Sequence, residues 1–401
     1  MKLLQLCNKP PYPPVDGGTL AMNSITQGLL SADCDVRVLS VCSDKHPVRR
    51  ELIPDDYMQR TRFDAVYVDL GIHLLDAGVA WLCGESYHVK RFISKEFSAK
   101  LREVLEEEEF DVVFVESIFL TPYVPLIRRH SRAKVLLRAH NVEHQIWQRI
   151  AKSEHNPFKR SYIKHLSLTL GTYEREHIND YDGVVCITEN DAAYFRQAGC
   201  RRPVVSIPFS ITPEAVDYVA PEPNSLFHLG SMDWLPNLEG INWFLDEVWP
   251  LVHKSMPQVT LYLAGRKMPK EMIDLQVEGV KVVGEVPDAN YFIGSKLINV
   301  VPLLSGSGIR VKIIEAMAAG KTVIATTVGA EGIHYEEGKN ILIADTPQQF
   351  VDQIHRCVED PDFCAEVGRN AFELITKEYS TETLTNKLLV FIDKILNIIL
   401  I

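Results

Sequence analysis

The residues best suited to chemistry in this 401-residue chain lie together at positions 301–320. An apolar run ends at Val301, a turn with two glycines follows, and the next residues favour a helix over 309–319 that Gly320 ends. A strand, glycine turn and helix start of this kind form an anion pocket, because unpaired N–H groups and the helix dipole both favour negative charge there.

Two cations and one acid make this pocket more specific. Arg310 and Lys312 place positive charge in the first turn of the predicted helix, where acids are normally preferred, so an anionic ligand is expected. Glu315 lies on the same helix and offers a carboxylate to sugar hydroxyls. The alternative is an ordinary strand, turn and helix with solvated charges, but the combination of Arg, Lys and Glu favours a phosphate site.

The length of 401 residues predicts two or three domains. The composition, with 46% hydrophobic and 24% charged residues, is that of a globular protein. The formal net charge of −11 argues against nucleic acid as a partner. The basic cluster at 128–134 is expected to be a solvated face, with contact to anionic lipid as the alternative.

Eight cysteines without metal-ligand spacing predict free thiols in a reducing compartment. Neither a signal peptide nor a membrane span is apparent, so a cytoplasmic location is expected.

Strands and helices alternate along the chain, which predicts an α/β protein. In the first half, strands are expected at 2–7, 36–41, 111–115, 135–139, 183–187 and 204–207, and helices at 19–30, 92–108 and 157–178. After a proline-rich stretch, strands are expected at 226–229, 259–264, 281–283, 298–301, 322–325 and 341–344, and helices at 237–253 and 347–358. No metal-binding motif follows a strand, and the acidic pair at 33–35 precedes one, so it is expected to form a turn.

This alternation predicts two doubly wound, Rossmann-like domains that face each other across a cleft. The expected parts are a first domain at 1–207, a linker at 208–223, a second domain at 224–375 and a helix at 376–401 that packs back on the first domain.

The carboxyl ends of parallel strands are where ligands bind, and this rule singles out His140. A lone histidine at a strand end is usually a polar loop residue, but the cleft-facing position favours a catalytic or substrate-binding role. Glu116 also follows a strand. Glu143 and His144 either join the site or simply begin the next helix.

Residues 226–342 resemble the donor-binding half of the retaining GT-B glycosyltransferases of group 1, a family with glycogen-synthase-like and mannosyltransferase-like members. The matching motifs lie at 227–232, 263–266, 283–288, 301–303, 308–326 and 337–340, and the most specific is Glu-Ala-Met-Ala-x-Gly. The first half matches more weakly, at 11–14, 16–18 and 138–141.

This resemblance implies transfer of a hexose from a UDP- or GDP-sugar to a glycan or lipid-linked acceptor in cell-surface polysaccharide biosynthesis. It implies retention of the anomeric configuration. Because the sequence has no convincing metal site, helix dipoles with Arg310 and Lys312 are expected to neutralise the leaving group, and no metal or other cofactor is expected. It also implies a cytoplasmic enzyme that works at the inner face of the membrane, with a peripheral membrane contact.

The resemblance also implies roles for particular residues. Glu315 is similar to the glutamate that holds the ribose, and Gly308 and Ile309 are expected to offer backbone N–H groups to the diphosphate. From the first domain, Gly17 and Gly18 are expected to approach the same phosphates. His140 matches a residue near the reacting sugar.

Three departures from the family pattern bear on the donor site. A family glutamate is replaced by Ser307, and two cations that usually clamp the phosphates are replaced by Ser231 and Asn237. Arg310 and Lys312 are close enough in sequence to substitute for that clamp. Two alternatives to the transferase remain open, namely a sugar-nucleotide epimerase of the same fold and a non-catalytic nucleotide-sugar binding protein.

Overall fold

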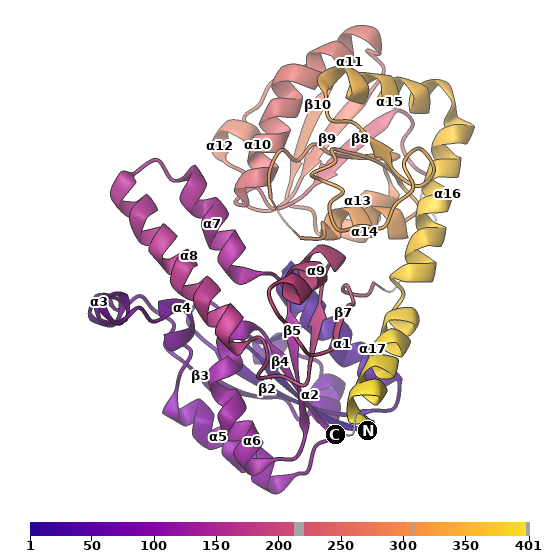
Figure 1. The fold of residues 1–401 in the computed structure, drawn as a ribbon. Coiled ribbons are helices and arrows are strands. Elements are labelled where there is room, and N and C mark those ends of the chain that lie inside the picture. Colours follow the sequence, from indigo (N-terminus) through magenta and orange to yellow (C-terminus); the bar gives the residue numbers. More distant parts are fainter. Residues whose placement is uncertain (212–219, 307, 398–401) are drawn as a thin grey trace. The chain divides into compact units, whose positions relative to one another are not determined.

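A computed structural model describes residues 1–211, 220–306 and 308–397 of the chain (Figure 1). The chain divides into two compact units. Unit 1 comprises Met1–Ser210 and Thr381–Ile401, and unit 2 comprises Ile211–Ser380.

Unit 1 is built on a seven-stranded sheet whose strand order is β3-β2-β1-β4-β5-β6-β7 and whose paired strands are all parallel. The strands are β1 (Lys2–Cys7), β2 (Asp35–Cys42), β3 (Asp64–Tyr67), β4 (Val112–Glu116), β5 (Lys134–Ala139), β6 (Gly183–Cys186) and β7 (Val204–Ser206). Every residue of β4 is buried, which explains the continuous apolar run in its sequence. Because the strands are parallel, their carboxyl ends meet at one edge, and the loop after β5 carries His140.

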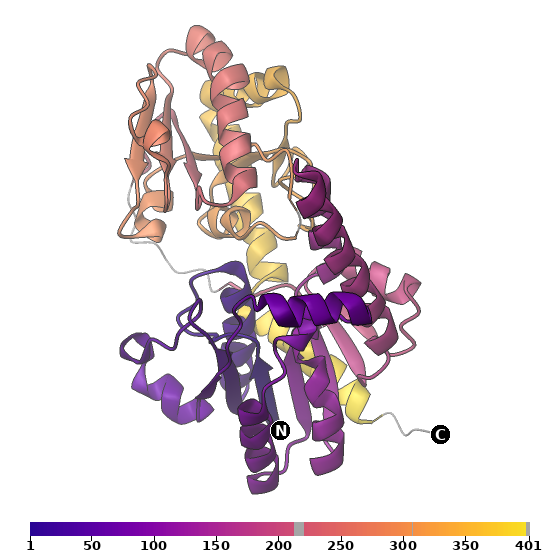
Figure 2. The same cartoon turned by 90° about the vertical axis from the view of Figure 1, so that its left-hand side faces the viewer.

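Helices cover both faces of this sheet (Figures 1 and 2). They are α1 (Gly17–Ser31), α2 (Asp55–Thr61), α3 (Leu74–Cys83), α4 (Tyr87–Lys90), α5 (Lys95–Glu107), α6 (Val124–His130), α7 (Glu143–Ser153), α8 (Pro157–His177), α9 (Glu189–Gln197) and α17 (Thr381–Leu396). Short 3-10 turns lie at Arg50–Leu52 and Ile118–Tyr123. The first long helix, α1, begins at a capping box in which Asp16 and Thr19 exchange hydrogen bonds, so it starts earlier than expected.

Two apolar clusters flank the sheet of unit 1. On one face, Phe97 of α5 packs with Leu4 and Val113 of the strands. On the other face, Met22 of α1 and Leu388 of α17 pack in a cluster that also contains Leu3. The last helix is therefore part of the core of unit 1, although the 170 residues of unit 2 separate Ser210 from Thr381 in the sequence.

Unit 2 is built on a six-stranded parallel sheet with strand order β10-β9-β8-β11-β12-β13. The strands are β8 (Ser225–Leu229), β9 (Thr260–Ala264), β10 (Val280–Gly284), β11 (Ile298–Val301), β12 (Thr322–Ala325) and β13 (Leu342–Ile343). The helices are α10 (Leu235–Trp243), α11 (Trp249–Ser255), α12 (Lys270–Ile273), α13 (Ala289–Gly294), α14 (Val311–Ala318), α15 (Pro347–Glu359) and α16 (Pro361–Glu378). A π-helical turn at Phe244–Val248 joins α10 to α11, where a single helix was expected.

The expected fold class is confirmed, since both units are α/β with parallel sheets. The unit boundaries fall after Ser210 and Ser380, whereas the sequence placed the domain ends at 207 and 375. The second boundary lies later because α16 continues to Glu378, with Ala371 and Ile375 buried in unit 2. Half of the expected linker at 208–223, residues 212–219, lies outside the described residues.

Residue Leu388 provides a test of the packing of α17. It is 1% exposed, whereas Val390 on the same helix is 72% exposed. We expect Leu388→Ala to lower the free energy of unfolding of unit 1 by about 2–5 kcal/mol, because it removes buried methyl groups and leaves a cavity. We expect the matched control Val390→Ala to change it by no more than about 0.5 kcal/mol. Urea denaturation followed by circular dichroism measures both, and equal effects would contradict the packing described for α17.

Candidate functional site

The carboxyl edge of the unit 2 sheet is shaped by two glycines at the ends of neighbouring strands. Gly230 follows β8 and Gly265 follows β9. Gly265 has a φ of +144°, and a Cβ atom there would lie 1.7 Å from the carbonyl oxygen of Gly230. Only glycine permits this approach. The two strand ends therefore lie close together beneath the loop and helix that carry the predicted anion pocket.

Lys312 places its ammonium group at this edge. The Lys312 Nζ donates to Asn237 Oδ1 at 2.5 Å and lies 3.1 Å from His228 Nε2. A Cβ atom on Gly230 would lie 2.7 Å from the same Nζ, so the ammonium group sits directly beside the turn after β8. Asn237 stands where the resemblance described above implies a lysine. The ammonium group of Lys312 on α14 therefore lies within hydrogen-bond distance of this position.

Burial works against the charge of this ammonium group. Burial, with the nearby Arg310 guanidinium as the second cause, lowers the pKa of Lys312 to about 7, and the Glu315 carboxylate opposes this shift. Burial also lowers the pKa of His228 well below its ordinary value, with the Lys312 charge as the second cause. His228 is therefore neutral. Its Nδ1–H donates to the Val300 carbonyl oxygen at 2.8 Å, which leaves Nε2 as the acceptor for Lys312.

Arg310 has a different environment from Lys312, although the sequence grouped the two. It is the N-cap residue of α14 and is buried. Its guanidinium group donates to the carbonyl oxygens of Gly308 at 2.6 Å and Val328 at 3.3 Å, and it lies 5.5 Å from the ring centroid of Trp234. These contacts hold the loop before α14 in place. Its position before the helix, not in its first turn, differs from the expectation.

Among the described residues, the N-terminus of α14 has no side-chain cap, because the side chain of Arg310 makes no capping hydrogen bond to the helix backbone. Gly308 has a φ of +81°, a left-handed conformation that glycine adopts readily. Glu315 is half-buried, and burial raises the pKa of its carboxyl group. Within the described residues, this carboxyl group makes no hydrogen bond with protein. Ser307, which replaces a family glutamate, lies outside the described residues.

In unit 1, His140 is held by a line of buried polar groups. Its Nε2 lies 2.8 Å from Glu116 Oε2, and Glu116 is fully buried at the end of β4. The other carboxylate oxygen accepts from Gln5 Nε2 at 2.7 Å, and Gln5 Oε1 accepts from Thr26 at 2.6 Å. A carboxylate accepts hydrogen bonds, so Nε2 of His140 carries the proton. This arrangement fixes both the tautomer and the orientation of the ring.

A second acidic group lies close to His140 in sequence. Glu143 begins α7, and burial, followed by the charge of Glu174, raises its pKa to about 8. Its backbone N–H donates to Glu174 Oε1 at 2.8 Å, and the Nδ1 of His144 contacts the other oxygen of Glu174. Glu174 thus fixes the start of α7 against α8. Burial therefore favours the protonated form of Glu143, a residue whose role the sequence left undecided.

Gly17 and Gly18 form the first turn of α1, at the carboxyl edge of the unit 1 sheet. The N-cap residue Asp16 is paired with Lys9 at 2.7 Å, so this helix start already contains a carboxylate and its counter-ion. A pocket of about 320 Å³ lies at the same edge and is lined partly by Lys9, Lys45 and Arg91. This pocket lies at the ends of β1, β2 and β3.

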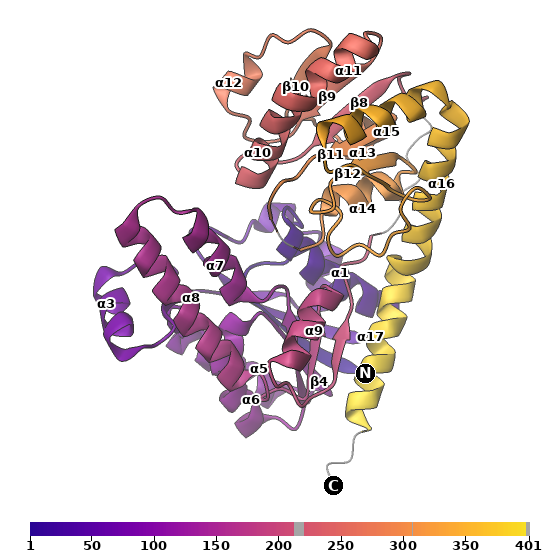
Figure 3. The ribbon, with the colours of Figure 1, turned by 45° about the horizontal axis from the view of Figure 1, so that its top comes forward.

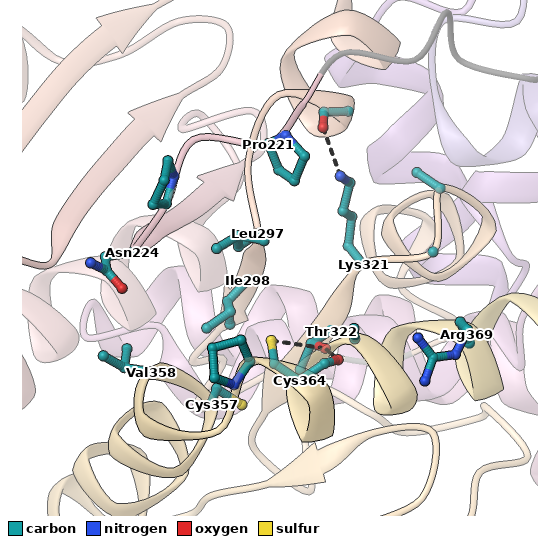
Figure 4. A pocket seen from close by; sticks show the side chains of 16 residues that line it. Pro221, Asn224, Leu297, Ile298, Lys321, Thr322, Cys357, Val358, Cys364 and Arg369 are labelled. Carbon is teal, nitrogen blue, oxygen red and sulfur yellow. Dashed lines mark hydrogen bonds between the residues drawn. The ribbon is translucent and has the colours of Figure 1, made fainter.

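A larger cavity of about 580 Å³ in unit 2 lies at the opposite edge of its sheet (Figure 4). Ile298 and Thr322, the first residues of β11 and β12, line it together with Lys321, Cys357 and Cys364. It contains none of the predicted donor residues.

The described residues include no cluster of three or more His, Cys, Asp or Glu side chains suited to a metal ion. Among the helices described, none has the length and apolar character needed to cross a bilayer.

The structure brings together Gly308, Ile309, Arg310, Lys312 and Glu315 in unit 2, and it places Gly17, Gly18 and His140 at the carboxyl edge of unit 1. The sequence missed the role of His228. A histidine inside an otherwise apolar strand was the available signal, because a buried polar side chain needs a partner.

Two family models match the chain. Residues 16–209 match the glycosyl transferase 4-like domain, and residues 223–360 match the glycosyl transferases group 1 domain. An uncharacterized 44.6 kDa protein in the cps region of Klebsiella pneumoniae is 24% identical over 293 residues, which cover 71% of this chain and 74% of that protein.

Solved structures show the same fold at low identity. HepE from Anabaena, in complex with UDP, aligns with a TM-score of 0.67 and 16% identity over 98% of this chain and 100% of that one. Sucrose-phosphate synthase from Thermosynechococcus elongatus aligns with a TM-score of 0.68 and 15% identity, covering 98% of this chain and 99% of its own. TarM from S. aureus aligns with a TM-score of 0.68 and 14% identity, covering 99% and 98%.

The environment of Lys312 can be tested in the free protein. We expect its ammonium group to titrate near pH 7, well below an ordinary lysine, because burial disfavours the charged form. NMR of reductively methylated lysines over pH 5–11 would show one resonance with this low midpoint, and Lys312→Arg would remove it. A titration near 10.5 for every lysine would contradict the burial described here.

Proposed function

We propose that the chain, whose two halves match glycosyl transferase family models, is a GT-B glycosyltransferase of group 1 that transfers a hexose from a nucleotide-sugar to a glycan or lipid-linked acceptor with retention of configuration. The observation that carries this proposal is the Lys312 ammonium group beside Gly230, on the helix that also presents Glu315.

The leaving group of such a reaction is a nucleoside diphosphate, whose negative charge must be stabilised as the bond to the sugar breaks. Lys312 supplies a cation, and the uncapped start of α14 supplies backbone N–H groups. Glu315 has a carboxyl group available for the ribose hydroxyls. These protein groups meet the charge of the diphosphate directly, which supports the proposal that the reaction needs no metal.

Lys312 also responds to the ligand. With a pKa of about 7, it is only partly charged in the free protein near neutral pH. A diphosphate beside it favours the protonated form, so binding is accompanied by proton uptake above pH 7. The affinity for a UDP-sugar therefore falls as the pH rises through 7 and beyond. The diphosphate of a UDP-sugar carries no group that titrates in this range.

In unit 1, His140 is proposed to contact the transferred sugar. Glu116 fixes the ring through Nε2, and Gln5 and Thr26 satisfy the rest of that buried network. Glu116 acts through His140, so it is a positioning residue. In the transfer, the bond between the anomeric carbon and the diphosphate oxygen breaks. The acceptor hydroxyl oxygen bonds to that carbon, and its proton leaves with the diphosphate.

UDP is the first nucleotide to test, because HepE and TarM have been solved with UDP bound. The cps-region relative supports a place in polysaccharide biosynthesis. A cytoplasmic location at the inner face of the membrane completes the proposal.

Incubation with UDP- and GDP-sugars in EDTA, with and without candidate acceptors, tests the proposed transferase activity by nucleotide release. Tight binding without any transfer or hydrolysis would favour a binding protein, and interconversion of the sugar without an acceptor would favour an epimerase.

Removal of the Lys312 charge tests the donor site. We expect Lys312→Met to weaken UDP-sugar binding by about 1–3 kcal/mol, as the loss of a charge-assisted hydrogen bond does. In the same variant, the affinity for the UDP-sugar should no longer fall between pH 6 and 8.5. Lys321→Met is the matched control, because Lys321 is also half-buried in unit 2 but hydrogen-bonds to Gly294. Isothermal titration calorimetry measures affinity and proton uptake, and equal losses in both variants would contradict the assignment.

The effects of two substitutions on kcat and KM test the hydrogen bond between His140 and Glu116. We expect His140→Ala to lower kcat by about 10²-fold or more if the ring contacts the reacting sugar. We expect Glu116→Gln to lower kcat less and to leave the KM for the donor nearly unchanged, because the ring is still present but its tautomer is no longer fixed. Circular dichroism checks that both variants fold. A Glu116→Gln variant with changed donor KM and normal kcat would contradict a positioning role.

A further inference from the structure

Helix α3 of unit 1 is apolar on two faces, only one of which is packed. Ala77 and Ala80 are buried in a small cluster with Leu166 of α8. Leu75 and Leu82 are 87% and 79% exposed, respectively. With the exposed Val79, these leucines follow the spacing of one helix face, so a row of large apolar side chains points away from the protein. Burial in unit 1 does not explain this second face.

The neighbouring hairpin of α7 and α8 adds further exposed apolar groups. α3 lies beside α8 in all three views (Figures 1, 2 and 3), and the rings of Trp81 and His165 are 6.0 Å apart between centroids. Phe158 at the start of α8 is 85% exposed, and Leu168 is 60% exposed. Exposed aromatic and aliphatic side chains therefore continue from α3 along the hairpin.

The same hairpin carries positive charge. Between residues 145 and 173 there are five Lys and Arg residues and one acid, Glu154. All five cations are exposed, and none forms an ion pair with a carboxylate among the described residues; they are Arg149, Lys152, Lys159, Arg160 and Lys164. This segment has a net charge of +4 in a chain whose net charge is −11.

A groove between the two helices gathers three of these cations. Lys152, Arg160 and Lys164 line a cavity of about 650 Å³ together with Leu168, and no acidic residue lines it. The groove combines cations with apolar walls. That combination suits a headgroup phosphate attached to a hydrocarbon chain.

We propose that α3 and the α7–α8 hairpin form a membrane-docking surface for anionic phospholipid. The apolar row of α3 and Phe158 insert at the boundary between headgroups and acyl chains, and the cations of the hairpin contact lipid phosphates. This inference deepens the proposed function by giving the membrane contact a surface and a lipid class. α7 begins only three residues after His140, so the docking surface is joined directly to the carboxyl edge of the unit 1 sheet.

The basic cluster at 128–134 is less suited to this role. It lies on α6 and just before β5, at the amino end of that strand, whereas the α7–α8 hairpin follows the carboxyl end. Arg128 is paired with Asp182 at 2.7 Å. The described residues of the cluster include no large exposed apolar side chain. Lipid contact, which the sequence suggested for this cluster, is therefore assigned to the hairpin.

Vesicle sedimentation tests the proposal with the full-length chain. We expect binding to phosphatidylcholine vesicles that contain phosphatidylglycerol, weaker binding at high salt, and little binding to pure phosphatidylcholine. The charge variant K152Q/K159Q/R160Q/K164Q should lower the partition coefficient by about tenfold or more, because each cation near an anionic surface contributes favourably. The apolar variant L75Q/L82Q should also lower it, even at low salt.

Matched controls separate this surface from general effects. R129Q/R132Q removes two exposed cations from the cluster at 128–134, and V390Q adds a polar group at an exposed apolar position on α17. We expect both controls to bind vesicles like the wild type. All variants should retain donor hydrolysis or transfer to a soluble acceptor without vesicles.

Several outcomes would overturn the proposal: equal binding to neutral vesicles, unchanged binding by the charge and apolar variants, or a dimer that L75Q/L82Q converts to a monomer. Retained vesicle binding by a wild-type protein without transferase activity would instead refute the proposed function and leave the docking surface intact. Loss of vesicle binding by every variant, controls included, would contradict the assignment to α3 and the hairpin.

Discussion

The candidate donor site depends on one ammonium group that is held where burial opposes its charge. Lys312 is bonded to Asn237 and His228, two neutral acceptors, instead of a carboxylate. A carboxylate partner would have neutralised the cation and left little attraction for a phosphate. Neutral acceptors orient the ammonium group without cancelling its charge. Only a bound anion then offsets the energetic cost of burying the charged ammonium group. The affinity for the anion therefore depends on the protonation of Lys312.

The same reasoning explains why the two neighbouring cations differ. Arg310 donates to the carbonyl oxygens of Gly308 and Val328, so its guanidinium group stabilises the loop. A guanidinium group keeps its charge when buried, and several fixed donors suit several carbonyl acceptors. Lysine loses its proton more readily, which makes Lys312 the responsive partner. In unit 1, the buried carboxylate of Glu116 serves a comparable orienting purpose for His140.

Much of the fold followed from local patterns in the sequence. Buried parallel strands such as β4 are continuous apolar runs, and the glycine after α14 ended that helix as expected. The partners of Lys312 were beyond this reasoning, because His228 and Asn237 are 84 and 75 residues away in sequence. α3 was missed for a related reason. A helix that is apolar on both sides lacks the single apolar stripe by which surface helices are usually identified.

Charge segregation gives the docking surface an orientation as well as an affinity. With +4 between residues 145 and 173 and −11 overall, the remainder of the chain carries −15. An anionic membrane repels the net negative charge of that remainder and attracts the hairpin, so an approach with the hairpin forward is favoured before any apolar contact forms. The attraction acts over about one Debye length, and the side chains of α3 and Phe158 then supply the short-range contact. Cations alone would give a weak, salt-sensitive encounter, and leucines alone would not select the membrane over another apolar surface. Both are needed for a contact that is oriented and reversible.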